Sequence, residues 1–520
     1  MNTRLTNIVN LINRIDTRLL IFCLLFLNTF SLILDENEEQ YLAFAKAFTN
    51  PDWIPGAFSL KDVPGARIIF DSIIGRLLDF MSFEQTEVLG RALIALLFAF
   101  PLARIFKRFQ FTNLSAIFTL QIICFFSHQS FFAKEWIFGS FEAKAVSYVF
   151  IFYSLSFLFD SRYFSSVIFS GLAVYFHFLV GGWYSLILFV YLLIAGMPLK
   201  RFIRYGLAFC CLTAPMGIYL AVTYLLDNPA VIGGVQISQV YVFLRNPHHL
   251  DMLGQIGKFG SSTQTGVVLS LLCCLLCIRL LKTSKAPLLR QVALLNVIIF
   301  CQQFLSLFIA IFDKTGGFLK YYPYRTGALS FFLMFLILGV ISRRSILRHA
   351  PAADQQSPGG KSRFSLSGAV ACLMALCIVT GLGVKVHKNI SESSEIFSPS
   401  PETSARLSLY GWIKDNTKPD AVFLDLNKDI RDGLDFIRRT ERDSFSVFKF
   451  IPTTNRLIYD WYMRVLEKKK VQADIAYVHK LRERYRIDYV LSKQPLSDNG
   501  LKLVFNNDHY FLYSLAVNRL

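Results

Sequence analysis

The side chains best able to do chemistry stand in five short segments rich in ionisable residues. The first is the acidic run Asp35-Glu36-Asn37-Glu38-Glu39, which directly follows an apolar stretch. A carboxylate fixed where such a stretch ends can act as a general base, orient an acceptor hydroxyl or hold a divalent cation. A solvated acidic cap is the alternative, and the residues alone leave both interpretations open.

Two further segments combine mixed charges or a histidine with small residues. Glu142 and Lys144 follow Lys134-Glu135-Trp136 and stand at the start of an apolar run, where mutual ion pairing is the favoured interpretation. His177 precedes Gly181-Gly182, which allow a tight reversal or a close helix approach. Its imidazole is either a hydrogen-bonded polar residue or a ligand.

The last two segments are basic. Arg245-Asn246-Pro247-His248-His249 suits a phosphate or pyrophosphate, because arginine binds phosphate through two hydrogen bonds and histidine can donate another. An ordinary loop is the alternative, and a metal site is less favoured since adjacent histidines point in different directions. Lys320-Tyr321-Tyr322-Pro323-Tyr324-Arg325 fits an interfacial aromatic belt and a clamp for a lipid-linked phosphate or sugar equally well.

Motifs of ATP use and of common hydrolases are absent from the sequence. It contains no G-x-x-x-x-G-K-[ST] loop, no H-E-x-x-H and no G-x-S-x-G. Any chemistry is therefore not driven by ATP within this chain.

The elements that must position these segments are apolar. The 520 residues are 54% hydrophobic and 17% charged, whereas soluble domains average about 45–50% and about 25%. We therefore exclude a soluble enzyme, a disordered tail and a disulfide-stapled secreted domain, and predict a polytopic α-helical membrane protein. All ten cysteines lie inside the apolar runs. About eleven transmembrane helices are predicted, over residues 19–34, 88–105, 114–132, 145–159, 163–178, 181–195, 206–224, 265–281, 291–312, 328–342 and 368–384.

Loop charge predicts how these helices are oriented. Alternate loops hold 19 basic residues against three acids, so the positive-inside rule makes them and the N-terminus cytoplasmic. Residues 385–520 would then lie outside, which in a bacterium means the periplasm or cell surface, with the chain in the inner membrane. The formal charge of +18 belongs mainly to residues 1–384, because residues 385–520 hold 23 basic against 18 acidic side chains. Nucleic acid is not an expected partner, since no reader motif accompanies the charge.

Three regions follow from these patterns. Residues 1–384 form the predicted transmembrane domain, residues 385–404 a linker, and residues 405–520 a small extracytoplasmic α/β domain. Another linker is predicted at residues 351–367. In the α/β domain we expect helices at 405–414, 458–466 and 474–485, strands at 421–424 and 487–491, and a hairpin at 501–515.

This layout resembles the GT-C superfamily of membrane glycosyltransferases, which place an acidic motif in the first outer loop. Asp35-Glu36 with Tyr41 stands at the matching place. An uncharacterised bacterial family of GT-C-like membrane proteins is more similar still. The matching segments are residues 141–144, 177–183, 245–249, 410–424, 436–442 and 460–464.

The resemblance implies a polyprenyl-phosphate-linked sugar donor and a catalytic carboxylate, here Asp35 or Glu36, that deprotonates or orients the acceptor. It implies that basic side chains of other outer loops neutralise the leaving phosphate. A divalent cation such as Mg²⁺ or Mn²⁺ is an open question, because the second acidic motif of several relatives is not clear here. The expected substrate-binding residues are Tyr41, Glu142, Lys144, His177, Arg245, His248, His249, Lys320, Tyr322 and Arg325.

Two functions compete for this sequence. The first is a GT-C-like glycosyltransferase that acts in the lipid bilayer and passes a sugar from a lipid-linked donor to an envelope glycan, lipid or protein acceptor. The second is a non-catalytic membrane scaffold or transport component of envelope polysaccharide assembly. An ion-coupled transporter would require inverted repeats, and the sequence has no visible repeat.

Overall fold

The computed structural model describes residues 11–225, 228–258, 260–349, 366–427 and 433–515, most of them in helices. Contacts divide the chain into two compact units. The helical unit consists of the described residues within 1–30, 89–216 and 246–389. The mixed unit consists of the described residues within 31–88, 217–245 and 390–520.

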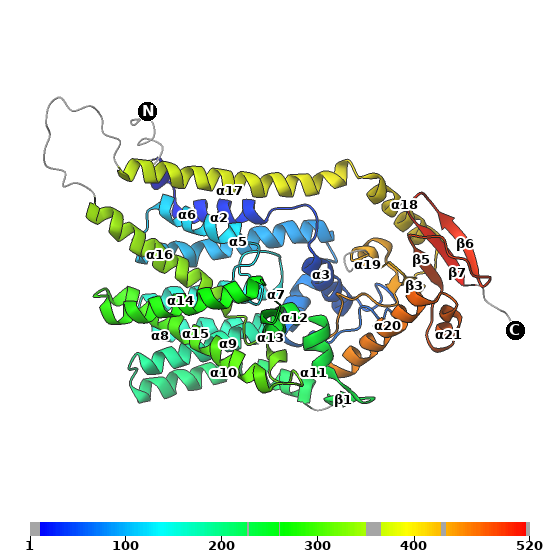
Figure 1. Cartoon of the computed structure of the whole chain (residues 1–520), viewed down its shortest axis with the longest axis horizontal. Helices are drawn as coiled ribbons and strands as arrows, with labels where there is room; N and C mark the ends of the chain where they lie inside the picture. Colours follow the sequence, from blue (N-terminus) through cyan, green and yellow to red (C-terminus); the bar gives the residue numbers. More distant parts are fainter. Residues whose placement is uncertain (1–10, 226–227, 259, 350–365, 428–432, 516–520) are drawn as a thin grey trace, which may run out of the picture. The chain divides into compact units, whose positions relative to one another are not determined.

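The helical unit consists mainly of apolar helices, some of which follow one another closely, whereas residues 126–142 and 313–326 form longer connections. Successive helices contact one another, as α7, α8 and α9 do, and as α14, α15 and α16 do (Figure 1). Three helices, α5 (Phe83–Arg108), α10 (Leu199–Leu225) and α17 (Leu366–Phe397), have residues in both units. The remaining elements are α2 (Thr17–Thr29), α6 (Asn113–Phe125), α7 (Ala143–Phe159), α8 (Tyr163–Phe176), α9 (Phe178–Ile194), α12 (Pro247–Leu250), α13 (Met252–Ile256), α14 (Ser262–Thr283), α15 (Pro287–Phe312), η3 (Leu319–Tyr321) and α16 (Gly327–His349).

Each of the eleven predicted spans coincides with one apolar helix of the described residues. Five of these are long and apolar enough to cross a membrane by length and composition: Phe83–Arg108, Leu199–Tyr224, Ser262–Thr283, Pro287–Phe312 and Leu373–Phe397. The other six are apolar over only 10–17 residues. The chain is therefore an α-helical integral membrane protein, and the count of eleven crossings stays a prediction.

The reversal between α8 and α9 shows how small residues let two helices approach. A Cβ added at Gly181 would lie 2.5 Å from the backbone nitrogen of Val174, whereas one at Gly182 would meet nothing within 4 Å. A serine hydroxyl joins α8 to its other neighbour at the same place, because Ser147 Oγ of α7 donates to the Ala173 carbonyl of α8 at 2.9 Å. The predicted close approach at Gly181-Gly182 is confirmed, and Gly181 is the residue that requires it.

The mixed unit contains helices and a five-stranded sheet. The strand order is β4-β3-β5-β7-β6; β3 is parallel to β4 and β5, and β7 is antiparallel to β5 and β6 (Figure 1). Its elements are α3 (Glu36–Thr49), η1 (Gly65–Arg67), α4 (Ile68–Leu77), β1 (Val231–Ile232), β2 (Val235–Gln236), α11 (Ile237–Gln239), η2 (Val240–Arg245), α18 (Pro401–Asn416), β3 (Val422–Asp425), α19 (Phe436–Thr440), β4 (Asp443–Ser444), α20 (Asn455–Ala473), α21 (Tyr477–Arg484), β5 (Tyr489–Ser492), β6 (Leu501–Asn506) and β7 (Phe511–Leu515).

The sheet buries one apolar core. Leu424 and Val490 on the parallel strands pack with Leu481 of α21 and Tyr513 of β7. Apolar side chains of this kind supply most of the stability of such a layer. The predicted strands at 421–424 and 487–491 correspond to β3 and β5, the terminal hairpin to β6 and β7, and the three predicted helices to α18, α20 and α21.

The predicted linker at residues 385–404 is mostly helical, and its role as a linker stays a prediction. Helix α17 continues to Phe397 because no proline or glycine interrupts residues 384–397. Helix α18 then begins at Pro401, where the Ser400 side chain accepts a hydrogen bond from the Thr403 amide. Of the other predicted linker, 351–367, residues 351–365 lie outside the described residues, and residues 366 and 367 belong to α17.

The compact units are not continuous in sequence, unlike the predicted domains 1–384 and 405–520. Two segments that precede residue 384, 31–88 and 217–245, belong to the mixed unit. The division into functional domains stays a prediction.

Candidate functional site

The acidic run after α2 begins helix α3. Asp35 Oδ1 accepts hydrogen bonds from the amides of Asn37 and Glu38 at 2.8 and 3.0 Å, and Glu38 Oε2 accepts one from the Asp35 amide at 2.9 Å. This reciprocal pair is a capping box, whose D-x-x-E spacing is visible in the sequence. Glu36 is 42% exposed at its side chain and lies 3.8 Å from Lys449 Nζ. Both predicted catalytic acids thus have structural partners, and their catalytic role stays a prediction.

The next acid of the run, Glu39, is buried against an arginine from the C-terminal part of the chain. Arg438 Nε and Nη2 donate to the two Glu39 carboxylate oxygens at 2.8 and 2.7 Å, and Arg438 Nη1 donates to Glu84. The Arg438 and Glu39 side chains are 8% and 6% exposed. This pair ties α19 to the start of α3.

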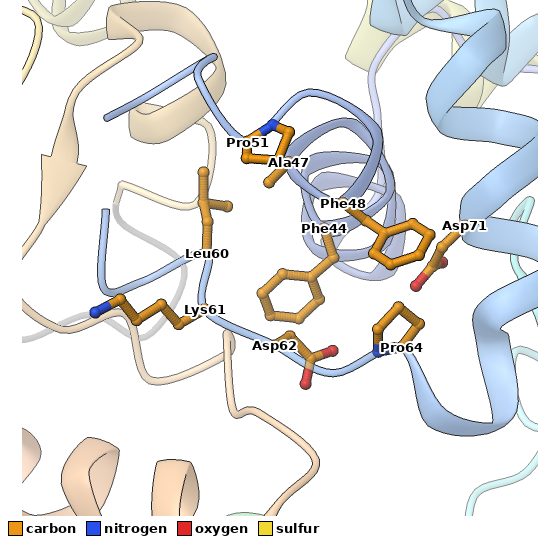
Figure 2. A pocket seen from close by; sticks show the side chains of 9 residues that line it. All are labelled: Phe44, Ala47, Phe48, Pro51, Leu60, Lys61, Asp62, Pro64 and Asp71. Carbon is orange, nitrogen blue, oxygen red and sulfur yellow. The ribbon is translucent and has the colours of Figure 1, made fainter. Parts of the chain in front are cut away.

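A cavity of about 230 Å³ lies between α3, the loop that follows it and α4 (Figure 2). One side is apolar and aromatic, and three ionisable side chains complete it. A hydroxyl-bearing ring or a small polar group would find both kinds of contact here. The lining residues are Phe44, Ala47, Phe48, Pro51, Leu60, Lys61, Asp62, Pro64 and Asp71.

Asp71 is the most unusual side chain of this cavity. It is 1% exposed, and neither carboxylate oxygen accepts a hydrogen bond within the part of the chain that the structure describes. Arg67 Nε lies 3.6 Å from Asp71 Oδ2. Burial raises the pKa of Asp71 to about 7, although Arg67 acts in the opposite direction. A carboxyl group that titrates near neutral pH inside a cavity can accept a proton from a bound hydroxyl.

Arg67 joins Asp71 to the second carboxylate of the cavity. Its guanidinium donates to Asp62, and the ring of Tyr41 lies 4.9 Å from its central carbon. Although burial acts against it, the charges of Asp62 and Asp71 raise the pKa of Arg67. The predicted Tyr41 therefore contacts Arg67, although it is not among the residues that line the cavity, and its role stays a prediction. Sequence reasoning missed Asp62, Arg67 and Asp71, for which the signal was an Arg and an Asp four residues apart at the start of an apolar helix.

In the helical unit, several predicted substrate-binding residues gather around Glu135. One of its carboxylate oxygens lies 3.4 Å from Lys144 Nζ, and the other lies 3.6 Å from His249 Nδ1 and 3.7 Å from Arg325 Nε. Glu135 is 2% exposed. Burial favours its neutral form, but these three neighbours hold the pKa of Glu135 below its ordinary value. Glu142 lies 3.3 Å from Lys144, as the ion-pair interpretation predicts.

Aromatic rings and histidines hold the cations of this cluster. The Arg325 guanidinium lies over the Tyr322 ring, with 3.9 Å between the guanidinium carbon and the ring centroid. Lys144 Nζ lies over the Trp136 ring, 3.8 Å from its centroid. Tyr322 has φ 52° and ψ 56°, a left-handed conformation that is costly for a residue with a Cβ. His177 Nε2 lies 2.5 Å from Arg325 Nη1. Glu142, Lys144, His177, His249, Tyr322 and Arg325 are thus brought together, and Glu135 at their centre was not predicted.

Three other predicted residues have different surroundings. Arg245 is buried in the mixed unit, where Nη2 donates to the Lys449 carbonyl at 3.0 Å. The ring of His248 lies beside that of His249, with 4.1 Å between the centroids. Lys320 Nζ lies 5.2 Å from the ring of Tyr321.

Metal ligands do not cluster in the described ranges, which contain no group of three or more His, Cys, Asp or Glu side chains able to hold a metal ion. Asp62 and Asp71 are the two acids of the cavity, and both face the Arg67 guanidinium. A divalent cation would have to share this space with that positive charge. These residues therefore do not fit Mg²⁺ or Mn²⁺.

The helices and the two clusters define a membrane protein with a group of acidic and basic side chains in each compact unit. Comparison with family models and with curated proteins gave no match. Among solved structures, the chain is similar to the crystal structure of ArnT from Cupriavidus metallidurans in the apo state, a GT-C glycosyltransferase, at 11% identity over 95% of this chain and 96% of that chain. The TM-score is 0.41, too low for this likeness to assign an activity.

Proposed function

We propose that this protein is a GT-C-like integral membrane glycosyltransferase. It transfers a sugar from a polyprenyl-phosphate-linked donor to a glycan, lipid or protein acceptor at the outer face of the membrane. The observation that carries the proposal is the cavity of the mixed unit, where the buried carboxyl group of Asp71 has no hydrogen-bond donor among the described residues.

Asp71 supplies the proton acceptor that the reaction needs. The acceptor hydroxyl oxygen forms a bond to the anomeric carbon, and the bond from that carbon to the phosphate oxygen breaks with its electron pair. The hydroxyl proton passes to Asp71, whose pKa of about 7 allows it to be ionised before the step and neutral after it. Phe44 and Phe48 provide the apolar wall against which a sugar ring can stack.

The Glu135 cluster of the helical unit is proposed, independently of the cavity, to bind a lipid-linked phosphate. Lys144 and Arg325 are cations with aromatic neighbours, and arginine suits phosphate because its guanidinium matches two phosphate oxygens. Glu135 balances part of this charge until the phosphate is bound.

The experiment is a transfer assay on the purified full-length chain in lipid nanodiscs. Polyprenyl phosphates that carry radiolabelled hexoses or pentoses are the donors, and delipidated envelope extract supplies the acceptors. We expect Asp71→Asn to lower the transfer rate by about 10²–10⁴-fold, the usual value of a general base. Asp52→Asn is the matched control, because Asp52 is an exposed acid in the segment between α3 and α4.

Each outcome bears on the proposal. Transfer by the wild-type chain that is lost in Asp71→Asn and kept in Asp52→Asn supports it. Full activity of Asp71→Asn overturns the assignment of the base, and the same assay on Asp35→Asn and Glu36→Gln then decides whether an acid of the first run acts instead. No transfer from any donor by a folded wild-type chain favours the alternative of a non-catalytic scaffold or transport component.

The proposed orientation has the N-terminus in the cytoplasm and residues 405–520 on the periplasmic or outer side of a bacterial inner membrane. The chain has no native cysteine beyond residue 377, so a cysteine placed at the partly exposed Lys493, with the ten native cysteines replaced by alanine, reports on the side of the membrane where residues 405–520 lie. Labelling of Lys493→Cys by a membrane-impermeant maleimide in intact spheroplasts supports this orientation. Labelling only after lysis contradicts it.

A further inference from the structure

One wall of the cavity is a loop without regular secondary structure. Residues 58–64 lie between α3 and η1, and Leu60, Lys61, Asp62 and Pro64 of this loop line the cavity (Figure 2). Within it, the Lys61 amide donates to the Phe58 carbonyl at 3.0 Å. A loop of this kind depends on side chains from other segments to hold its backbone groups.

Asp443 of β4 holds the beginning of this loop. Its Oδ2 accepts a hydrogen bond from the Phe58 amide at 2.9 Å, and its Oδ1 accepts bonds from the Ser59 amide at 3.2 Å and the Ser59 hydroxyl at 2.5 Å. Asp443 is 3% exposed, and β4 is fixed in the sheet by its parallel pairing with β3. A buried carboxylate that accepts three hydrogen bonds is a strong anchor for the two backbone amides.

Thr453 holds the end of the loop. Its amide donates to Asp62 Oδ1 at 2.8 Å, and its hydroxyl oxygen lies 2.9 Å from the same Asp62 atom and 2.5 Å from the Val63 carbonyl. Asp62 is in turn paired with Arg67, which faces Asp71. A continuous series of contacts therefore leads from Thr453 to the acid in the cavity.

We infer that Asp443 and Thr453 are positioning residues of the cavity: they fix its loop wall and, through Asp62 and Arg67, the charge beside Asp71. All of these residues belong to the mixed unit. The C-terminal residues are thus part of the site itself, although nearly 400 positions separate them from the loop in the chain. The effect on the loop is independent of any activity, and only the effect on transfer rests on the proposed function.

Hydrogen exchange on the full-length chain in nanodiscs tests the inference without an activity assay. We expect Thr453→Val and Asp443→Asn to speed amide exchange in peptides that cover residues 57–64 by about fivefold, the equivalent of one lost hydrogen bond. Thr453→Ser keeps the hydroxyl and should exchange like the wild type. Lys493→Gln is the control, because it removes an exposed ion pair with Glu402 elsewhere in the C-terminal part.

Faster exchange confined to residues 57–64 in Thr453→Val, restored in Thr453→Ser, supports the inference. Unchanged exchange there in folded Thr453→Val and Asp443→Asn overturns it. Should Asp443→Asn fail to fold, Thr453→Val alone decides, since it removes a single hydroxyl. If the wild-type chain transfers sugar, Thr453→Val should also displace the pH at which transfer reaches half its maximum, a result that a general loss of folded protein would not produce. A wild-type chain without transfer activity would contradict the proposed function, whereas the hydrogen-exchange test of the loop contacts would still hold.

Discussion

Arg67 Nε lies 3.6 Å from Asp71 Oδ2, four residues away, and the same guanidinium is paired with Asp62. The Arg67 guanidinium is thus the neighbouring cation of two buried carboxylates, and its contact with Asp62 is shorter than its contact with Asp71. This sharing is the physical reason why burial is able to raise the pKa of Asp71. A fully compensated acid at this position would stay ionised and would be a poor proton acceptor.

The first prediction concerns pH. If Asp71 is the general base, transfer at limiting substrate should rise as the pH increases through about 7, because only the ionised carboxylate accepts a proton. Initial rates between pH 5 and 9 measure this. Asp71→Glu should retain a rising limb, and a wild-type profile that is flat over this range would contradict the role of Asp71.

The same carboxyl group predicts how stability depends on pH. Its pKa is raised above its ordinary value in the folded chain, so the folded state binds more protons than the unfolded state between about pH 4 and 7. The contribution of Asp71 to the free energy of unfolding is therefore greatest below pH 4 and is lost as the pH rises through 7. Thermal unfolding in detergent should show a smaller fall between pH 5 and 8 for Asp71→Asn than for the wild type. Equal falls would contradict the raised pKa.

The Glu39–Arg438 pair should be needed for stability. Arg438→Leu leaves the Glu39 carboxylate buried without its partner, which costs about 3–5 kcal/mol. Arg439→Leu is the matched control, because its pair with Asp435 involves a side chain that is 35% exposed and should cost about 1 kcal/mol or less. Denaturant unfolding followed by tryptophan fluorescence compares the two. Similar losses in both variants would refute a special role for Arg438.

Arg325 should determine binding of a lipid phosphate. Arg325→Gln removes the guanidinium stacked on Tyr322 and should weaken binding of undecaprenyl phosphate by about tenfold, since a charge-assisted hydrogen bond contributes about 1.5–3 kcal/mol. Lys258→Gln, at an exposed lysine of the same unit, should bind like the wild type. Native mass spectrometry measures both. Undiminished binding by Arg325→Gln would separate this cluster from the phosphate.

Adjacent glycines give a test of helix packing. Gly181→Ala should destabilise the chain by about 1–3 kcal/mol, because the new Cβ would meet the Val174 backbone nitrogen at 2.5 Å. Gly182→Ala introduces the same methyl group into open space, where alanine favours the helix over glycine by about 1 kcal/mol. The melting temperature should therefore fall in the first variant and not in the second. The reverse order would show that α8 and α9 do not approach at Gly181.

Local patterns in the sequence were sufficient for much of the fold. Apolar runs predict eleven helices, each of which is found among the described residues. Short apolar segments predict β3, β5 and the terminal hairpin. These predictions succeed because a run of apolar side chains has few favourable structures, whatever surrounds it. The resemblance to GT-C proteins likewise depends on short motifs read along the chain. The helix that extends to Phe397 was not predicted, because a polar composition does not by itself end a helix.

The candidate site was decided by the tertiary structure. In the sequence, Asp71 is one acid in an apolar helix and Glu135 is one acid beside a lysine. Asp71 titrates near neutral pH only because its surroundings remove water from it, and Glu135 is a centre only because Lys144, His249 and Arg325 reach it from three other segments. Asp443 and Thr453 meet the cavity loop only after folding. The free energy of a charged group depends on what lies within a few ångströms of it, and neighbours in space are set by packing and not by position in the chain.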